Sequence, residues 1–275
     1  MRGFLHNKKA VAGLSIILFF GLVAIFAPLL DPYNPSNFNF LPWQGPSAAH
    51  WLGTTGQGQD ELSWLLYSAR DSMVIAVSTA GVISVVQLGF GIFSGYAGGA
   101  TDGVLSTFTN VFLVLPGLPL LIVIDAYLPN KGTVTTIFVL SVTGWAWGAR
   151  VLRAQAISLR DRPFMEAARM SGERRWRIVL FNVVPNMFGV LAANFFGAAV
   201  YAVLTEAGLL FLGVINVNTV SWGSMLYWAQ AGSAMLENKW LPMLLPGLCI
   251  LALGTGFGLL NFAVDEVADP RLRRS

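Results

Sequence analysis

The chain has few side chains of the types and spacing that catalytic or metal centres need. Its one cysteine, Cys249, excludes a disulfide framework, and with only His6 and His50 beside it a His/Cys zinc site is not expected. The sequence contains no G-x-x-x-x-G-K-[ST] phosphate loop and no H-E-x-x-H zinc motif. We therefore expect neither an enzyme nor a subunit that binds ATP, a metal or another cofactor.

The most informative polar residues lie in one segment, residues 150–182, which contains eight arginines. Within it Pro163 can open a short helix, because its missing N–H is not needed there, and Gly172 can close it. We expect Asp161 to cap this helix. One face would carry Phe164, Ala167, Ala168 and Ser171.

A helix of this length is not stable alone in water, so it must dock on another surface. The small residues on its face would let another protein approach closely. An alternative interpretation is an arginine-rich loop that only fixes membrane topology and contacts lipid headgroups.

Two acidic residues, Asp125 and Glu206, lie inside or near the ends of long apolar runs. Charge within a membrane is costly and often functional, so both are candidates for a translocation path. Asp125 would meet an amino group of a bound molecule or, as we favour, reach interfacial water. Glu206 would line the path or pair structurally, and the sequence favours neither.

The elements that position these residues follow from hydropathy. The chain is 55% hydrophobic and 11% charged, whereas an average soluble domain is about a quarter charged. Runs of about 20 apolar residues are long enough to cross a bilayer as helices. We expect an all-α integral membrane protein with six spans, over residues 10–30, 72–101, 103–128, 132–149, 178–212 and 240–264. Residues 213–239 read mostly as a loop.

The basic residues predict the orientation of these spans. Fourteen lie on one side: three before the first span, eight in residues 150–182 and three after the last span. Only Arg70, Lys131 and Lys239 lie on the other side. The positive-inside rule places both termini and the arginine-rich segment in the cytoplasm.

This topology divides the chain into four parts. Residues 1–30 form a cytoplasmic start and the first helix, and residues 31–71 an external segment. That segment ends in an amphipathic helix that begins near Asp60 and lies on the membrane. Residues 72–265 form a five-helix core that includes the cytoplasmic segment 150–182, and residues 266–275 form a cytoplasmic tail.

Several glycines have the G-x-x-x-G spacing that permits close contact between membrane helices. They are Gly91, Gly95 and Gly99 in the second span, and Gly254 and Gly258 in the last. We expect them to pack helices, within this chain or against a partner, and not to bind substrate.

Glu166, Ala167, Ala168, Gly172 and Pro185 keep the spacing of a known motif, E-A-A-x-x-x-G followed by a proline. The stretch resembles the EAA motif of permease subunits of binding-protein-dependent ABC importers. At the tail of the motif the usual isoleucine and leucine are replaced by Asn182 and Val184.

Three further stretches resemble the dipeptide, oligopeptide and nickel branch of that family, and its second permease in particular. They are Gly53-Thr54 with Gly58, Asp60 and Tyr67-x-Ala69-Arg70; Leu204-Thr205-Glu206-Ala207 with Ser221-Trp222-Gly223; and the tail Asp269-Pro270-Arg271-Leu272. Thr55 and Gln59 depart from the branch pattern.

The resemblance implies a type I ABC importer permease in the cytoplasmic (inner) membrane of a prokaryote. It implies four kinds of partner: a homologous second permease, two cytoplasmic ATPase subunits that hold ATP and Mg, an external substrate-binding protein and the lipid bilayer. No nucleic acid is among them. The helix that contains Pro163, Phe164, Glu166, Ala167, Ala168, Ser171 and Gly172 would be the coupling helix on an ATPase subunit.

The resemblance implies peptides as cargo, but similar permeases carry oligosaccharides, nickel or other solutes. A different class, a transporter driven by an ion gradient, would show inverted repeats or several buried ionisable groups. We find no convincing repeat and only the two candidate acids.

Overall fold

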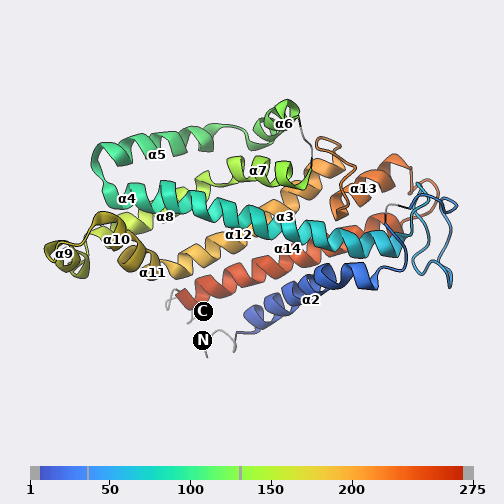
Figure 1. The fold of residues 1–275 in the computed structure, drawn as a ribbon, viewed down its shortest axis with the longest axis horizontal. Helices are drawn as coiled ribbons and strands as arrows, with labels where there is room; N and C mark the ends of the chain where they lie inside the picture. Colours follow the sequence, from blue (N-terminus) through green and yellow to red (C-terminus); the bar gives the residue numbers. More distant parts are fainter. Residues whose placement is uncertain (1–6, 36, 130–131, 269–275) are drawn as a thin grey trace.

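The computed structural model describes residues 7–35, 37–129 and 132–268, and within them the regular structure is helical (Figure 1). Four helices of the described chain are each long and apolar enough to cross a membrane alone. They are α2 (Lys8–Leu30), α3 (Glu61–Gln87) with its extension to Ala97, α12 (Phe188–Phe211) and α14 (Leu241–Ala268). These helices pack side by side along the long axis of the molecule.

The expected single span over residues 103–128 is instead two helices, α5 (Gly99–Val114) and α6 (Gly117–Tyr127), bent by 94°. Pro116 explains the break, because a proline disfavours helical backbone in the residue before it. Leu115 is accordingly extended, with ψ 132°. Four single helices and this broken pair give up to five spans by length, so six continuous spans are not observed in the described residues.

The expected span over residues 132–149 is also divided. It forms α7 (Thr133–Gly144), too short to cross a bilayer alone, and the start of α8 (Ala146–Arg160). From α8 the chain enters α9 (Pro163–Met170), which lies at one extreme end of the molecule (Figure 1). It returns to α12 through α10 (Arg175–Ile178), the π-helix η2 (Val179–Val183) and α11 (Val184–Asn186).

Two expectations for the segments outside the spans need correction. The amphipathic helix from Asp60 is not separate, since its residues form the first turns of α3. No glycine or proline interrupts the chain between Glu61 and Ala80, so the helix continues without a break. In the expected loop 213–239, residues Trp222–Ala231 form the helix α13. A capping box formed by Ser221 and Ser224 stabilises the start of this helix.

His50 is buried, although its place on a loop predicts a solvated side chain. Its Nδ1 lies 2.8 Å from Asp60 Oδ1. The other carboxylate oxygen of Asp60 accepts bonds from the backbone N and the Oγ of Ser63, at 2.8 and 2.7 Å, and so caps α3. The network anchors the segment 31–60 to the helix, and it has no catalytic geometry because the serine donates to the carboxylate and not to the imidazole.

The glycines of the second span have different environments. A Cβ on Gly91 would lie 2.6 Å from Ala149 O, and one on Gly95 would lie 2.6 Å from Arg153 O. Both glycines therefore let α8 approach the extension of α3 closely. That extension consists of the π-helix η1 (Leu88–Phe93) and α4 (Ser94–Ala97). Gly99 makes no such contact, and with φ +58° it is the first residue of α5, next to Gly98, which separates α5 from α4.

On α14, Gly254 and Gly258 have space around them within the described chain. The close contact there is made by Gly256, where a Cβ would lie 2.8 Å from Ile16 of α2, and by Gly13 opposite. Packing of Gly254 and Gly258 against a partner chain stays a prediction, because their spacing does not say which helix face meets a neighbour.

We predict that Gly91→Ala lowers thermal stability, because its Cβ would meet a backbone carbonyl that cannot rotate away. Overpacking of about 1–3 kcal/mol corresponds to a melting midpoint lower by roughly 3–10 °C. The measurement is the thermal midpoint in detergent by size-exclusion chromatography. Gly89→Ala is the matched control, since a Cβ there meets nothing within 4 Å. Equal midpoints for both variants would contradict the close contact.

Candidate functional site

The helix α9 begins with Pro163 in its first turn and ends before Gly172, whose φ of +78° is left-handed. The residue at the cap position is Arg162, without a side-chain capping bond, so the expected cap by Asp161 is wrong. Asp161 instead contacts Arg160, at 3.3 Å.

The residues expected to meet a partner lie mostly on the exposed surface of this helix. Phe164, Glu166, Ala167, Ser171 and Gly172 are exposed, and Ala168 is half-buried. The chain's own contact is made by Met165, which is fully buried among side chains of α4, α8, α10 and η2. Sequence analysis missed Met165; its position on the opposite face from Ala167 was the available signal.

Arg169 holds α9 in place from its other end. Its Nη2 donates to Arg160 O at 2.7 Å, and its guanidinium lies over the ring of Tyr96, 5.5 Å from the centroid. The helix is therefore fixed to the end of α8 and to α4, although it is too short to be stable by itself.

One ion pair joins α8 to α5 near this end of the molecule. Arg153 donates from Nε and Nη2 to the two carboxylate oxygens of Asp102, at 2.6 and 2.7 Å. A bidentate pair of this kind fixes orientation as well as distance.

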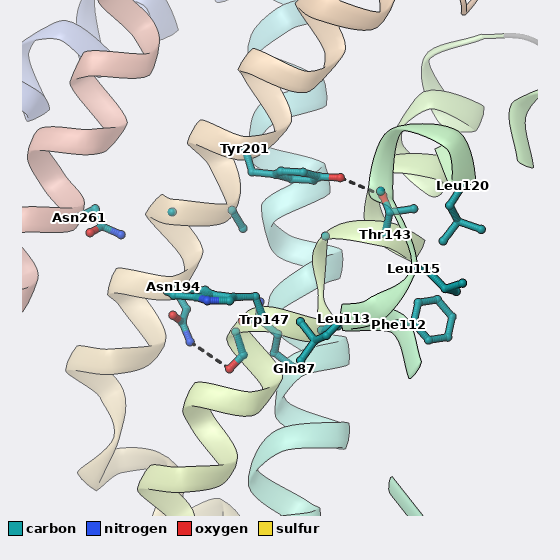
Figure 2. A pocket seen from close by; sticks show the side chains of 16 residues that line it. Gln87, Phe112, Leu113, Leu115, Leu120, Thr143, Trp147, Asn194, Tyr201 and Asn261 are labelled. Carbon is teal, nitrogen blue, oxygen red and sulfur yellow. Dashed lines mark hydrogen bonds between the residues drawn. The ribbon is translucent and has the colours of Figure 1, made fainter. Parts of the chain in front are cut away.

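A cavity of about 370 Å³ lies further along the same helices, between α3, the break of α5 and α6, α7, α8, α12 and α14 (Figure 2). It is lined by Gln87, Phe112, Leu113, Leu115, Gly117, Leu120, Thr143, Gly144, Ala146, Trp147, Gly148, Asn194, Gly197, Ala198, Tyr201 and Asn261. None of these lining residues is charged.

The polar side chains of this cavity carry amide and hydroxyl groups and, at Trp147, an indole N–H. Tyr201 and Thr143 share a hydrogen bond of 2.9 Å, and Asn261 donates to Ala193 O at 2.6 Å. Asn194 lies 3.5 Å from Gly148 O (Figure 2). Gln87 is 3% exposed and its Oε1 has no hydrogen-bond partner among the described residues.

The two acids proposed for a path do not line this cavity. Asp125 is buried on α6, and Glu206 is buried on α12, where one carboxylate oxygen has no hydrogen-bond partner in the described chain. Sequence analysis therefore missed the residues of the cavity. Uncharged polar residues inside apolar runs were a possible signal, but many such residues only pack helices.

No group of three or more His, Cys, Asp or Glu residues in the described chain is arranged to hold a metal ion. The site is thus an uncharged cavity, joined by α8 to an exposed short helix.

Comparison with known proteins decides the family. Residues 87–274 match the family described as binding-protein-dependent transport system inner membrane component. Residues 1–46 match the N-terminal TM domain of oligopeptide transport permease C. The chain belongs to this family of membrane transport permeases.

Similar proteins cover almost the whole chain. The dipeptide transport system permease protein DppC of Bacillus subtilis is 31% identical over 98% of this chain and 83% of its own length. The oligopeptide transport system permease protein OppC of the same organism is 31% identical over 100% and 89%. OppC of Mycobacterium tuberculosis is 31% identical over 99% and 94%.

Family membership shows that the cavity and α9 belong to a membrane transport component. The family match includes α8, α9 and all the helices after them, so the exposed helix and every residue that lines the cavity lie within the matched residues 87–274. The family consists of membrane components, in agreement with the long apolar helices of this chain.

We predict that the Asp102–Arg153 pair stabilises the junction of α5 and α8. Asp102→Asn and Arg153→Gln should each lower the thermal midpoint by about 2–4 °C, in line with roughly 1 kcal/mol for a partly exposed pair. The exchanged pair, Asp102→Arg with Arg153→Asp, should recover more than half of the loss.

Asp161→Asn is the matched control, because the Asp161 side chain is 71% exposed. Additive losses in the exchanged pair would show that the two side chains do not stabilise each other.

Proposed function

We propose that this chain is one of two permease subunits of an ATP-driven peptide importer in the inner membrane of a prokaryote. Its relatives are named for dipeptide and oligopeptide transport, which supports peptides over oligosaccharides or nickel as cargo. The chain would cross the membrane six times, with α5–α6 and α7–α8 as two broken crossings. Both termini and α9 would be cytoplasmic.

The observation that carries the proposal is the exposure of the EAA residues at the tip of the molecule. Glu166, Ala167 and Gly172 face outward, while Met165 and Arg169 fix the helix to the chain's own core. A short helix with its small residues exposed and its other face held firmly is suited to a groove on a second protein. That protein would be an ATPase subunit, and two such subunits would bind ATP and Mg.

The mechanism follows from how α9 is attached. It is joined directly to α8, and through α10, η2 and α11 to α12. Both α8 and α12 contribute residues to the cavity. Movement of α9 with the ATPase subunits would therefore tilt two walls of the cavity. The permease would then have two conformations, and the nucleotide bound by the ATPase subunits would shift the equilibrium between them.

The cavity would form this chain's part of the path, and the second permease would complete it. Amide and hydroxyl groups can bond the main chain of any peptide, and the absence of charge among the lining residues imposes no preference on peptide side chains. Specificity would then lie mainly in an external binding protein that delivers the cargo.

We predict that Glu166→Lys and Gly172→Val each reduce peptide uptake roughly tenfold or more, a typical coupling effect. The lysine reverses the charge of an exposed residue, and valine is strained at a φ of +78°. The measurements are uptake in the native cell and mass spectrometry of subunits that co-purify with the tagged chain. The wild type should recover a second permease and two ATPases, and the variants fewer ATPases.

Glu237→Lys is the matched control, because it makes the same change of charge on an exposed residue at the predicted external side. Normal uptake by Glu166→Lys and Gly172→Val, with all chains present in the membrane, would contradict the role of α9.

We predict that Asn194→Asp changes the preference of the path. A carboxylate in the cavity should lower the uptake of anionic peptides relative to cationic ones by roughly threefold to tenfold. The ratio of the two uptake rates is compared with that of the wild type, so any preference of the binding protein cancels.

Asn186→Asp is the control, since Asn186 is exposed on α11, does not line the cavity and donates to Asn182 O within its own turn. An unchanged ratio in Asn194→Asp, with normal amounts of protein, would show that cargo does not pass this cavity.

A further inference from the structure

A second hollow lies far from the amide-lined cavity, between α2 and α3. It has a volume of about 570 Å³, and it is lined by Gly21, Ala24 and Ile25 of α2 and by Val74 and Val77 of α3. Ile25 is 71% exposed and Val74 44%, so the groove opens outward from the helix pair. Arg70 is the one charged residue that lines it.

One end of the groove lies where the apolar part of α3 starts and that of α2 ends. Arg70 lies two residues before the charge-free run that begins at Ser72, and Pro28 lies two residues before the end of α2. From Arg70 to Ser78 the groove follows α3 for about 12 Å, close to half of a hydrocarbon core of about 30 Å. The groove therefore extends from the predicted external interface into one leaflet.

A polar hollow of about 540 Å³ adjoins the groove, because Pro28 lines both. Asp31, Tyr33, Asn34 and Tyr67 line the polar hollow. Asp31 Oδ1 accepts a bond of 3.3 Å from Tyr33 N.

The groove is thus lined by a cation, Arg70, and the adjoining polar hollow by an anion, Asp31. Arg70 is exposed and forms no ion pair with the residues that the structure describes. The adjacent carboxylate of Asp71 accepts a hydrogen bond from Thr133 Oγ1, at 3.3–3.4 Å.

We propose that the groove and the polar hollow together bind one molecule of phosphatidylethanolamine from the outer leaflet. Its phosphate lies on the Arg70 guanidinium, whose planar donors match phosphate oxygens. Its ammonium group, which has three N–H donors, faces Asp31, and an acyl chain fills the groove over Gly21 and Ala24. Phosphatidylglycerol offers no cation to Asp31, and phosphatidylcholine offers no N–H donor. The inference is independent of the cargo and of the ATPase partners.

The test is native mass spectrometry of the full-length chain, purified in mild detergent with the subunits that accompany it. The preparation is titrated with phosphatidylethanolamine, phosphatidylglycerol and phosphatidylcholine of identical acyl chains. We expect the wild type to retain phosphatidylethanolamine at a concentration several-fold lower than the other two lipids.

Three variants separate the parts of the site. Arg70→Gln should weaken retention of all three lipids by roughly fivefold to tenfold. Asp31→Asn should remove only the preference for phosphatidylethanolamine. Gly21→Leu should fill the groove and weaken all three lipids without a change of charge, since a Cβ there meets only Met73 Cε, at 3.8 Å.

Lys239→Gln is the control, because it removes a basic residue on the same predicted side that lines neither hollow. Two results would overturn the proposal. One is equal lipid retention by the wild type and Arg70→Gln. The other is a wild-type chain that binds no lipid or prefers phosphatidylglycerol. Absence of lipid would show that another subunit covers the groove, and a preference for phosphatidylglycerol would show that Asp31 does not bind the ammonium group.

Discussion

The positions of the cavity and of α9 depend on the close contact between α8 and the helix formed by α3, η1 and α4. Gly148 lies against the amide of Gln87, Gly91 against Ala149, and Gly95 against Arg153. Side chains at these glycines would separate the two helices. Because they are absent, α8 runs along its neighbour from the cavity to the end that carries α9, and one helix pair sets the geometry of both places.

Polar groups are distributed along this helix pair in a way that suits transport. The side chains that line the cavity are uncharged, whereas ion pairs and arginines gather near α9. Charge buried in an apolar environment is costly, so an uncharged cavity is compatible with dense packing and with cargo of varied charge. At the other end, charges are partly hydrated and can fix the orientation of a helix that lacks stability of its own.

Breaks in the helices occur where the backbone permits them. Pro116 separates α5 from α6, and the π-helices η1 and η2 change the helical phase within longer helices. The break at Pro116 lies beside the cavity, since Leu115 and Gly117 line it. A continuous helix over residues 103–128 would not turn there, so the broken span contributes directly to the shape of the cavity.

The sequence by itself determined the helical class, the apolar runs, the short helix between Pro163 and Gly172 and the family, because hydropathy, proline and glycine act locally and motifs keep their spacing. Tertiary structure alone decided which faces meet. It turned Met165 inward, gave close contacts to Gly13 and Gly256, and brought Gln87, Asn194 and Asn261 to one cavity. Residues on three different helices are separated by more than 50 positions in sequence, and no local pattern records that they share a space.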